Sequence, residues 1–173
     1  MTALDFSRDG RLLASGDSAG VVRLWNLPSG RNRVIRAHTL GVTSVQFSPD
    51  GKILLTAGRD GEARTWSVAT RRLMQSMRWH FGPLGGAAFS PDGRWIVTAG
   101  PTAAGVGLVS TGRRVLLLHA GVKEPLIGAA FAGANGQTIV AASRDGTIRQ
   151  FRCDICGDLD DLVALAKRRL SRR

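Results

Sequence analysis

The chain of 173 residues is 43% hydrophobic and 21% charged, with a formal net charge of +11, as expected for one domain with a buried core. It has neither the run of roughly 20 apolar residues that a membrane helix needs nor a basic and apolar leader, so a cytoplasmic protein without membrane contact is expected. Its arginines are spread along the whole chain, which favours a solvated surface over a nucleic-acid site.

One phrase recurs at a nearly fixed interval. It reads F-S-R-D-G at residues 6–10, F-S-P-D-G at 47–51 and 89–93, and F-A-G-A-N-G at 131–136. The phenylalanines are 41, 42 and 42 residues apart, and such a period is the signature of a repeat architecture. The predicted repeats span residues 1–37, 38–79, 80–118 and 119–152.

Each repeat is expected to form one four-stranded antiparallel sheet. In the second repeat, the apolar residues of 42–47 predict a strand that ends in a turn, where proline fixes φ and glycine accepts a positive φ. Further strands are predicted at 53–55, 63–66 and 72–77, with a second turn at 59–61. Such a sheet cannot bury its faces alone, so neighbouring repeats are expected to stack.

The second repeat resembles the WD-repeat family of β-propellers. His38, Thr56, Asp60 followed by glycine, and Trp66 stand in the order and spacing of the family pattern. The resemblance implies that these four side chains form a hydrogen-bonded structural network, and a buried carboxylate and imidazole require such mutual satisfaction. The predicted fold is all-β: a partial WD-repeat propeller of four blades, the last without its outer strand.

The other repeats keep only parts of this pattern. In the third repeat, His80 and Thr98 are kept, but Leu108 aligns with Trp66, and residues 100–107 are rich in glycine and alanine. Only the second repeat has the whole pattern. The third strand of the third repeat is therefore expected to be the loosest.

A different pattern occupies residues 153–173. A C-x-x-C-G phrase precedes residues 158–170, where apolar residues recur at helical spacing, acidic residues lead and basic residues close; this predicts an amphipathic C-terminal helix. The phrase C-x-x-C-G-x-L-D-D-L resembles the segment after the last blade in large bacterial, especially actinobacterial, multidomain proteins, including signal-transduction ATPases with numerous domains. The resemblance implies a true C-terminal region of a larger signalling protein.

The chain also begins inside a repeat. When Phe6 is aligned with Phe47, Met1 lies opposite Val42, so we expect more repeats upstream, with Met1 at an internal valine position. Four blades leave an apolar sheet face open at each end. This predicts either a homodimer that closes an eight-bladed ring or an unstable fragment.

The sequence contains no catalytic or cofactor motif. Neither a G-x-x-x-x-G-K-[ST] nor an H-E-x-x-H nor a G-x-S-x-G pattern occurs, so a protein that is not an enzyme and holds no cofactor is expected. Cys153 and Cys156 are the only cysteines. Because zinc would need two more ligands and a thioredoxin-like motif a βαβ context, a packing role is expected, with metal binding or redox chemistry as the alternatives.

Partner binding is expected on the loops at one end of the blades. Arg59 and Arg144 hold equivalent positions two repeats apart, and arginine and aromatic side chains are favoured anchors of interfaces. The alternatives are solvated turn residues for the arginines and packing between blades for the aromatics. The candidate residues are Asp17, Arg59, Trp79, Phe81, Lys123 and Arg144.

The expected function is a protein–protein interaction scaffold or sensor module. The alternative is a basic adaptor that binds nucleic acid or an acidic surface through its arginines and the tail at residues 167–173.

Overall fold

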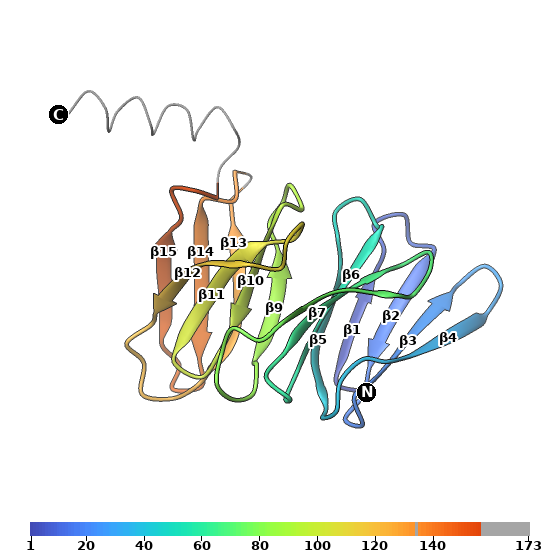
Figure 1. Cartoon of the computed structure of the whole chain (residues 1–173), viewed down its shortest axis with the longest axis horizontal. Helices are drawn as coiled ribbons and strands as arrows, with labels where there is room; N and C mark the ends of the chain where they lie inside the picture. The colour runs from blue at the N-terminus through green and yellow to red at the C-terminus, as the bar shows by residue number, and fades with distance from the viewer. Residues whose placement is uncertain (134, 157–173) are drawn as a thin grey trace.

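The computed structural model describes residues 1–133 and 135–156, which form fifteen strands in four antiparallel sheets (Figure 1). Within each sheet, every strand pairs with the next strand in sequence. We call the sheets blades 1 to 4. They contain, in order, β1 (Ala3–Phe6), β2 (Leu12–Gly16), β3 (Val21–Asn26) and β4 (Arg31–Arg36); β5 (Val42–Phe47), β6 (Ile53–Gly58), β7 (Ala63–Ser67) and β8 (Leu73–Met77); β9 (Gly86–Phe89), β10 (Trp95–Ala99), β11 (Ala103–Leu108) and β12 (Arg114–His119); and β13 (Leu126–Ala132), β14 (Thr138–Ser143) and β15 (Ile148–Arg152).

The blades lie side by side as an open arc, with blade 1 at one end and blade 4 at the other (Figure 1). This is the all-β, partial propeller that the sequence predicts, and the described part of blade 4 has three strands. The predicted helix at residues 158–170 lies outside the described residues. In the part of the chain that the structure describes, no helix is long and apolar enough to cross a membrane.

Serine and aspartate side chains hold the first turn of a blade closed. In blade 2, the Ser48 hydroxyl donates to Asp50 Oδ1 at 2.6 Å, and that oxygen accepts the Lys52 backbone N–H at 3.1 Å. The bond from Ser48 is the main cause of the lowered pKa of Asp50. Equivalent pairs make the same bond in blades 1 and 3. The recurring F-S-x-D-G phrase is therefore a turn fixed by its own side chains.

In blades 2 and 3 the phenylalanine of this phrase packs against the preceding blade. Phe47 and Phe89 are each 6% exposed and lie in the clusters that join blades 1 and 2, and blades 2 and 3. Their backbone N–H groups also donate to the preceding blade, Phe47 to Asp5 Oδ2 and Phe89 to Gln46 Oε1, both at 2.7 Å. Burial of such a ring contributes about 1.5–3 kcal/mol, so the phrase fixes the stacking as well as the turn.

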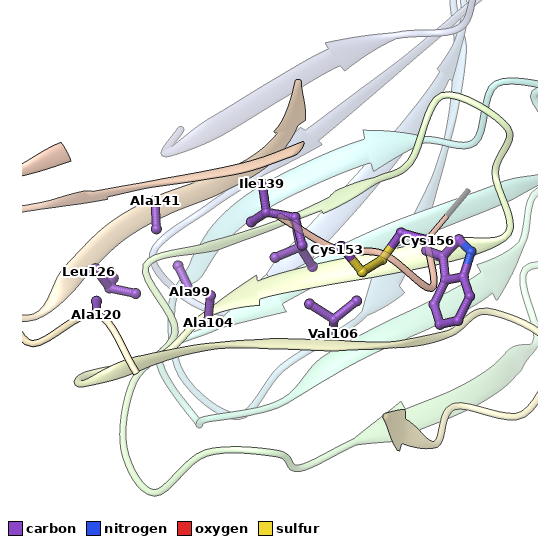
Figure 2. Close-up of a cluster of buried hydrophobic side chains, with 11 residues drawn as sticks. Ala99, Ala104, Val106, Ala120, Leu126, Ile139, Ala141, Cys153 and Cys156 are labelled. Carbon is purple, nitrogen blue, oxygen red and sulfur yellow. A yellow bond between two sulfur atoms is a disulfide. The ribbon is translucent and has the colours of Figure 1, made fainter. Parts of the chain in front are cut away.

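Blades 3 and 4 share a third cluster, which includes both cysteines (Figure 2). Cys153 and Cys156 are bonded to each other and are 0% and 1% exposed. The Cys153 N–H donates to Gln137 O at 2.7 Å, a bond that the equivalent residues make in the other three blades. In blade 4 the cysteine pair therefore forms the turn that, in blades 1 to 3, precedes the outer strand.

Blade 3 corrects one alignment made from the sequence. Trp66 lies opposite Leu54 in blade 2, and the equivalent of Leu54 in blade 3, Ile96, lies opposite Gly107. The residue at the tryptophan position is therefore Gly107, and not Leu108. The cause is the turn between β10 and β11, which is one residue shorter than the turn between β6 and β7.

Trp79, from the loop before blade 3, fills the space that this glycine leaves. A Cβ on Gly107 would lie 2.5 Å from Cη2 of the indole, and a Cβ on Gly105 would lie 3.2 Å from Cε3. The indole N–H donates to Gly112 O at 3.1 Å. Strand β11, expected to be the loosest, is a strand of six residues, five of them buried, and Trp79 packs on it.

We expect Trp79→Ala to lower the free energy of unfolding by about 2–4 kcal/mol, because the space over the two glycines would be left empty. The control is Phe81→Ala, where the ring is fully exposed and the expected change is within about 0.5 kcal/mol. Urea unfolding followed by circular dichroism measures both. Equal losses would contradict the packing role of Trp79.

Candidate functional site

Four side chains of blade 2 form a continuous hydrogen-bonded chain. His38 Nδ1 lies 2.9 Å from Asp60 Oδ1, and His38 Nε2 lies 2.9 Å from the Thr56 hydroxyl. Trp66 donates its indole N–H to the same hydroxyl at 3.0 Å. The structure thus brings together the four residues that the resemblance groups, and the role that this geometry supports is structural.

The partners of His38 determine its tautomer. The Asp60 carboxylate only accepts, so His38 donates from Nδ1 and accepts the Thr56 hydroxyl at Nε2. Burial lowers the pKa of His38, and the hydrogen bond that it donates to Asp60 offsets only part of this effect. Burial would raise the pKa of Asp60, but the bond from His38 and further hydrogen bonds lower it overall. A neutral imidazole therefore joins a hydroxyl to an ionised carboxylate.

Blade 3 keeps only the histidine–threonine part of this hydrogen-bonded network. His80 Nε2 lies 2.8 Å from the Thr98 hydroxyl, but among the described residues no carboxylate bonds the other ring nitrogen. Gly100 packs against that nitrogen, where a Cβ would be 2.2 Å from His80 Nδ1, as Gly58 packs against His38 Nδ1 in blade 2. Burial, with a smaller contribution from Arg114, lowers the pKa of His80 to about 4.

We expect acid to destabilise the fold through His80. Between pH 6.5 and about 4 the unfolded chain binds a proton at this histidine and the folded chain does not, so the free energy of unfolding falls as the pH decreases through this window. His80→Gln is expected to lose less stability than the unchanged chain between pH 7 and pH 5. Urea unfolding at both pH values measures this, with His119→Gln, at an exposed histidine, as the control. Equal losses for His80→Gln and the unchanged chain would contradict the assignment.

A cavity of about 610 Å³ lies at the end of the blades that carries the turns between the second and third strands. All four blades contribute to it, mostly through their inner strands and the loops that lead into them. Its lining is Thr2, Val42, Thr43, Arg59, Pro83, Leu84, Gly85, Pro101, Pro125, Leu126, Ile127 and Arg144.

Of the residues that the structure describes, Arg59 and Arg144 are the only charged ones in this lining. Their backbones are fixed, because the Arg59 N–H donates to Gly41 O at 2.9 Å and the Arg144 N–H donates to Pro125 O at 3.0 Å. Both residues are exposed. Among the described residues, neither guanidinium has a hydrogen-bond or ion-pair partner, so both are available to an anion.

Two other arginines near these turns, Arg23 and Arg64, are paired with acidic residues. Arg23 lies 2.9 Å from Asp17, and Arg64 lies 2.6 Å from Glu62 and 3.3 Å from Asp60. Their charges are therefore locally neutralised, unlike those of Arg59 and Arg144.

The remaining sequence candidates lie outside the cavity lining. Asp17 is held by Arg23, and the Lys123 backbone N–H donates to Asp145 at 3.2 Å. Trp79 packs on β11, as described above, and Phe81 is fully exposed. The sequence analysis missed Thr43, whose buried hydroxyl has no hydrogen-bond partner in the part of the chain that the structure describes.

The opposite end of the blades gathers basic residues from two repeat positions. The turn between the first and second strands and the turn between the third and fourth strands lie at this end. A backbone hydrogen bond joins these two turns in each of blades 1 to 3. Two equivalent positions on these turns carry six exposed basic residues in blades 1 to 3, and among the described residues the only ion pair these six make is a 3.9 Å contact between Lys52 and Asp50. We call them the basic turn face: Arg11, Lys52, Arg94, Arg31, Arg72 and Arg113.

The potential metal ligands of the described residues do not form a comparable cluster. In residues 1–133 and 135–156, no three His, Cys, Asp or Glu side chains are placed to hold a metal ion.

Comparison with known proteins agrees with the blades and their hydrogen-bonded network. The family described as WD domain, G-beta repeat matches residues 1–26, 30–67 and 71–101, more than half of the chain. The chain belongs to the WD40 repeat family. The last matched segment ends in the shortened turn of blade 3, just before the glycines of β11.

Solved structures show the same arrangement of blades. The crystal structure of the computationally designed Ika4 protein superimposes with a TM-score of 0.76 at 24% identity, over 87% of this chain and 89% of that chain. At this identity the likeness shows the fold alone. A comparison with curated proteins finds no match.

Proposed function

We propose that this chain is a non-catalytic scaffold that binds an acidic segment of a protein partner in the cavity lined by Arg59 and Arg144. WD40 repeats typically mediate protein–protein interactions and are generally non-catalytic. The observation that carries the proposal is that both arginines line one cavity and that neither guanidinium has a partner among the described residues.

The rest of the lining supports an acidic peptide as the ligand. In residues 1–133 and 135–156 no carboxylate lines the cavity, and its walls are largely apolar. Pro83, Pro101 and Pro125 have no backbone N–H, so the two arginines are the main donors that the lining offers. Paired carboxylates on a peptide match guanidinium groups in geometry and charge, and aliphatic side chains between them would contact the apolar wall.

We expect Arg59→Ala and Arg144→Ala each to weaken binding of a rhodamine-labelled peptide of alternating Glu, Asp and Leu by roughly tenfold or more, since each removes a charge-assisted hydrogen bond. Fluorescence anisotropy measures the affinity. Arg31→Ala, on the basic turn face, is the matched control and is expected to bind like the unchanged chain. A peptide with Gln and Asn in place of the acids should bind weakly. Equal weakening by all three arginine variants would contradict the site.

The basic turn face favours a second candidate function, the adaptor that binds nucleic acid. Arginines that are spread through the sequence are gathered on one end of the fold, because equivalent positions of successive repeats lie side by side. Six basic side chains with a single long ion pair among the described residues are suited to contact phosphates.

For this second function, we expect the double variant Arg31→Ala/Arg72→Ala to bind duplex DNA more weakly and to reduce the slope of log affinity against log salt by about 2. Arg59→Ala/Arg144→Ala is the control with the same change in charge. Anisotropy of a labelled duplex over a salt series measures both. A duplex affinity that does not depend on salt, or equal effects of the two double variants, would remove this function.

We further propose that the module belongs to a larger bacterial signalling protein of the cytoplasm and works as a homodimer. The C-x-x-C-G-x-L-D-D-L resemblance supports the first point. The exposed side chains of the end blades support the second.

A further inference from the structure

Blade 1 exposes side chains that are buried at the same positions of the next blades. Phe6 is 54% exposed, whereas its equivalents Phe47 and Phe89 are each 6% exposed. Leu4 is 48% exposed, whereas its equivalent Val45 is 7% exposed. In blades 2 and 3 the preceding blade covers this face. The outer face of blade 1 is therefore built as an interior face.

Blade 4 shows the matching feature on its other face. Ile148 lies opposite Ala142, the register that Val22, Ala63 and Ala104 hold in blades 1, 2 and 3. These three residues are each 0% exposed, whereas Ile148 is 69% exposed. In blades 1 to 3 the following blade covers this face, and no described residue does so in blade 4.

We infer that a second copy of this chain covers both faces, with the Phe6 face of one copy packed on the Ile148 face of the other. The two faces are complementary, because the chain already contains this type of contact three times, between its successive blades. They lie at opposite ends of the arc (Figure 1), so the described residues of one copy cover neither face.

Head-to-tail contacts of this kind form a ring when the rotation closes and a filament when it does not. Two copies supply eight blades, within the four to eight that are typical of propellers, and a third copy would exceed that range. We therefore assign the closed dimer, in which the same contact occurs twice. This assignment does not depend on the cavity at Arg59 and Arg144.

The polar bonds between blades point to a specific gain-of-function variant. Asp5 and Gln46 each accept the N–H of the phenylalanine in the next blade. Ala130 holds the equivalent position in blade 4 and has no acceptor in its side chain. Ala130→Gln would supply one to the Phe6 N–H of the second copy.

Sedimentation velocity over a concentration series tests the dimer. We expect the chain to dimerise, and we expect Phe6→Glu and Ile148→Glu each to raise the dimer dissociation constant by at least about tenfold. Both positions are exposed in one copy, so the far-UV circular dichroism of each variant should be unchanged. Phe81→Glu and Val34→Glu, at a fully exposed and a 57% exposed position, are the matched controls. Ala130→Gln should lower the dissociation constant.

Three results would overturn the inference. A monomer at every concentration would show that the faces stay uncovered. Assemblies that grow steadily with concentration would show a filament in place of a ring. Loss of the dimer in Phe6→Glu but not in Ile148→Glu would show that like faces pair. None of these results affects binding of the acidic peptide to Arg59 and Arg144, so failure of either proposal is distinguishable.

Discussion

Each sheet of this chain is too small to bury its own faces, and stacking on its neighbours is the contact on which the rest of the structure depends. Phe47 and Phe89 mark that contact, with the ring buried against the preceding blade and the N–H bonded to a side chain of it. The turn that follows is held by serine and aspartate, so one short phrase sets both the hairpin and the angle at which the hairpin meets its neighbour. The same dependence explains why Phe6 and Ile148 are exposed.

Stacking is retained in blades where the internal hydrogen bonds are not. Blade 2 has the complete chain from Asp60 to Trp66, and blade 3 lacks both its carboxylate and its tryptophan, yet the buried strands of blade 3 are as continuous as those of blade 2. A net hydrogen bond contributes about 0.5–1.5 kcal/mol, whereas burial of one large apolar side chain contributes about 1.5–3 kcal/mol. Loss of part of a network is therefore tolerable when a ring such as Trp79 restores the packing.

The sequence predicted those features that depend on one repeat at a time. The recurring turn predicted the blades and their strands, and the resemblance to the WD-repeat pattern implied that His38, Thr56, Asp60 and Trp66 meet. It did not predict the position of Gly107, because a turn shortened by one residue changes the register without changing the composition. The cavity was not predicted either, since Thr43 and its neighbours converge only when four blades stack. The arginines are dispersed in the sequence, and those at equivalent repeat positions come together only when the blades stack.

The two ends of the blades differ because the carboxylates at each end have different hydrogen-bond partners. At the end with the cavity, Asp17 and Glu62 pair with arginines and leave Arg59 and Arg144 as the unpaired cations of that lining. At the other end, the Asp9 and Asp50 side chains are engaged by the serine hydroxyl and the backbone of their own turns. Those bonds lower the pKa of both carboxyls, and the basic side chains beside them point into solvent with little direct pairing. Because the two sets of cations share no residue, the proposed binding of an acidic peptide at one end would leave the basic turn face open to a second anionic partner.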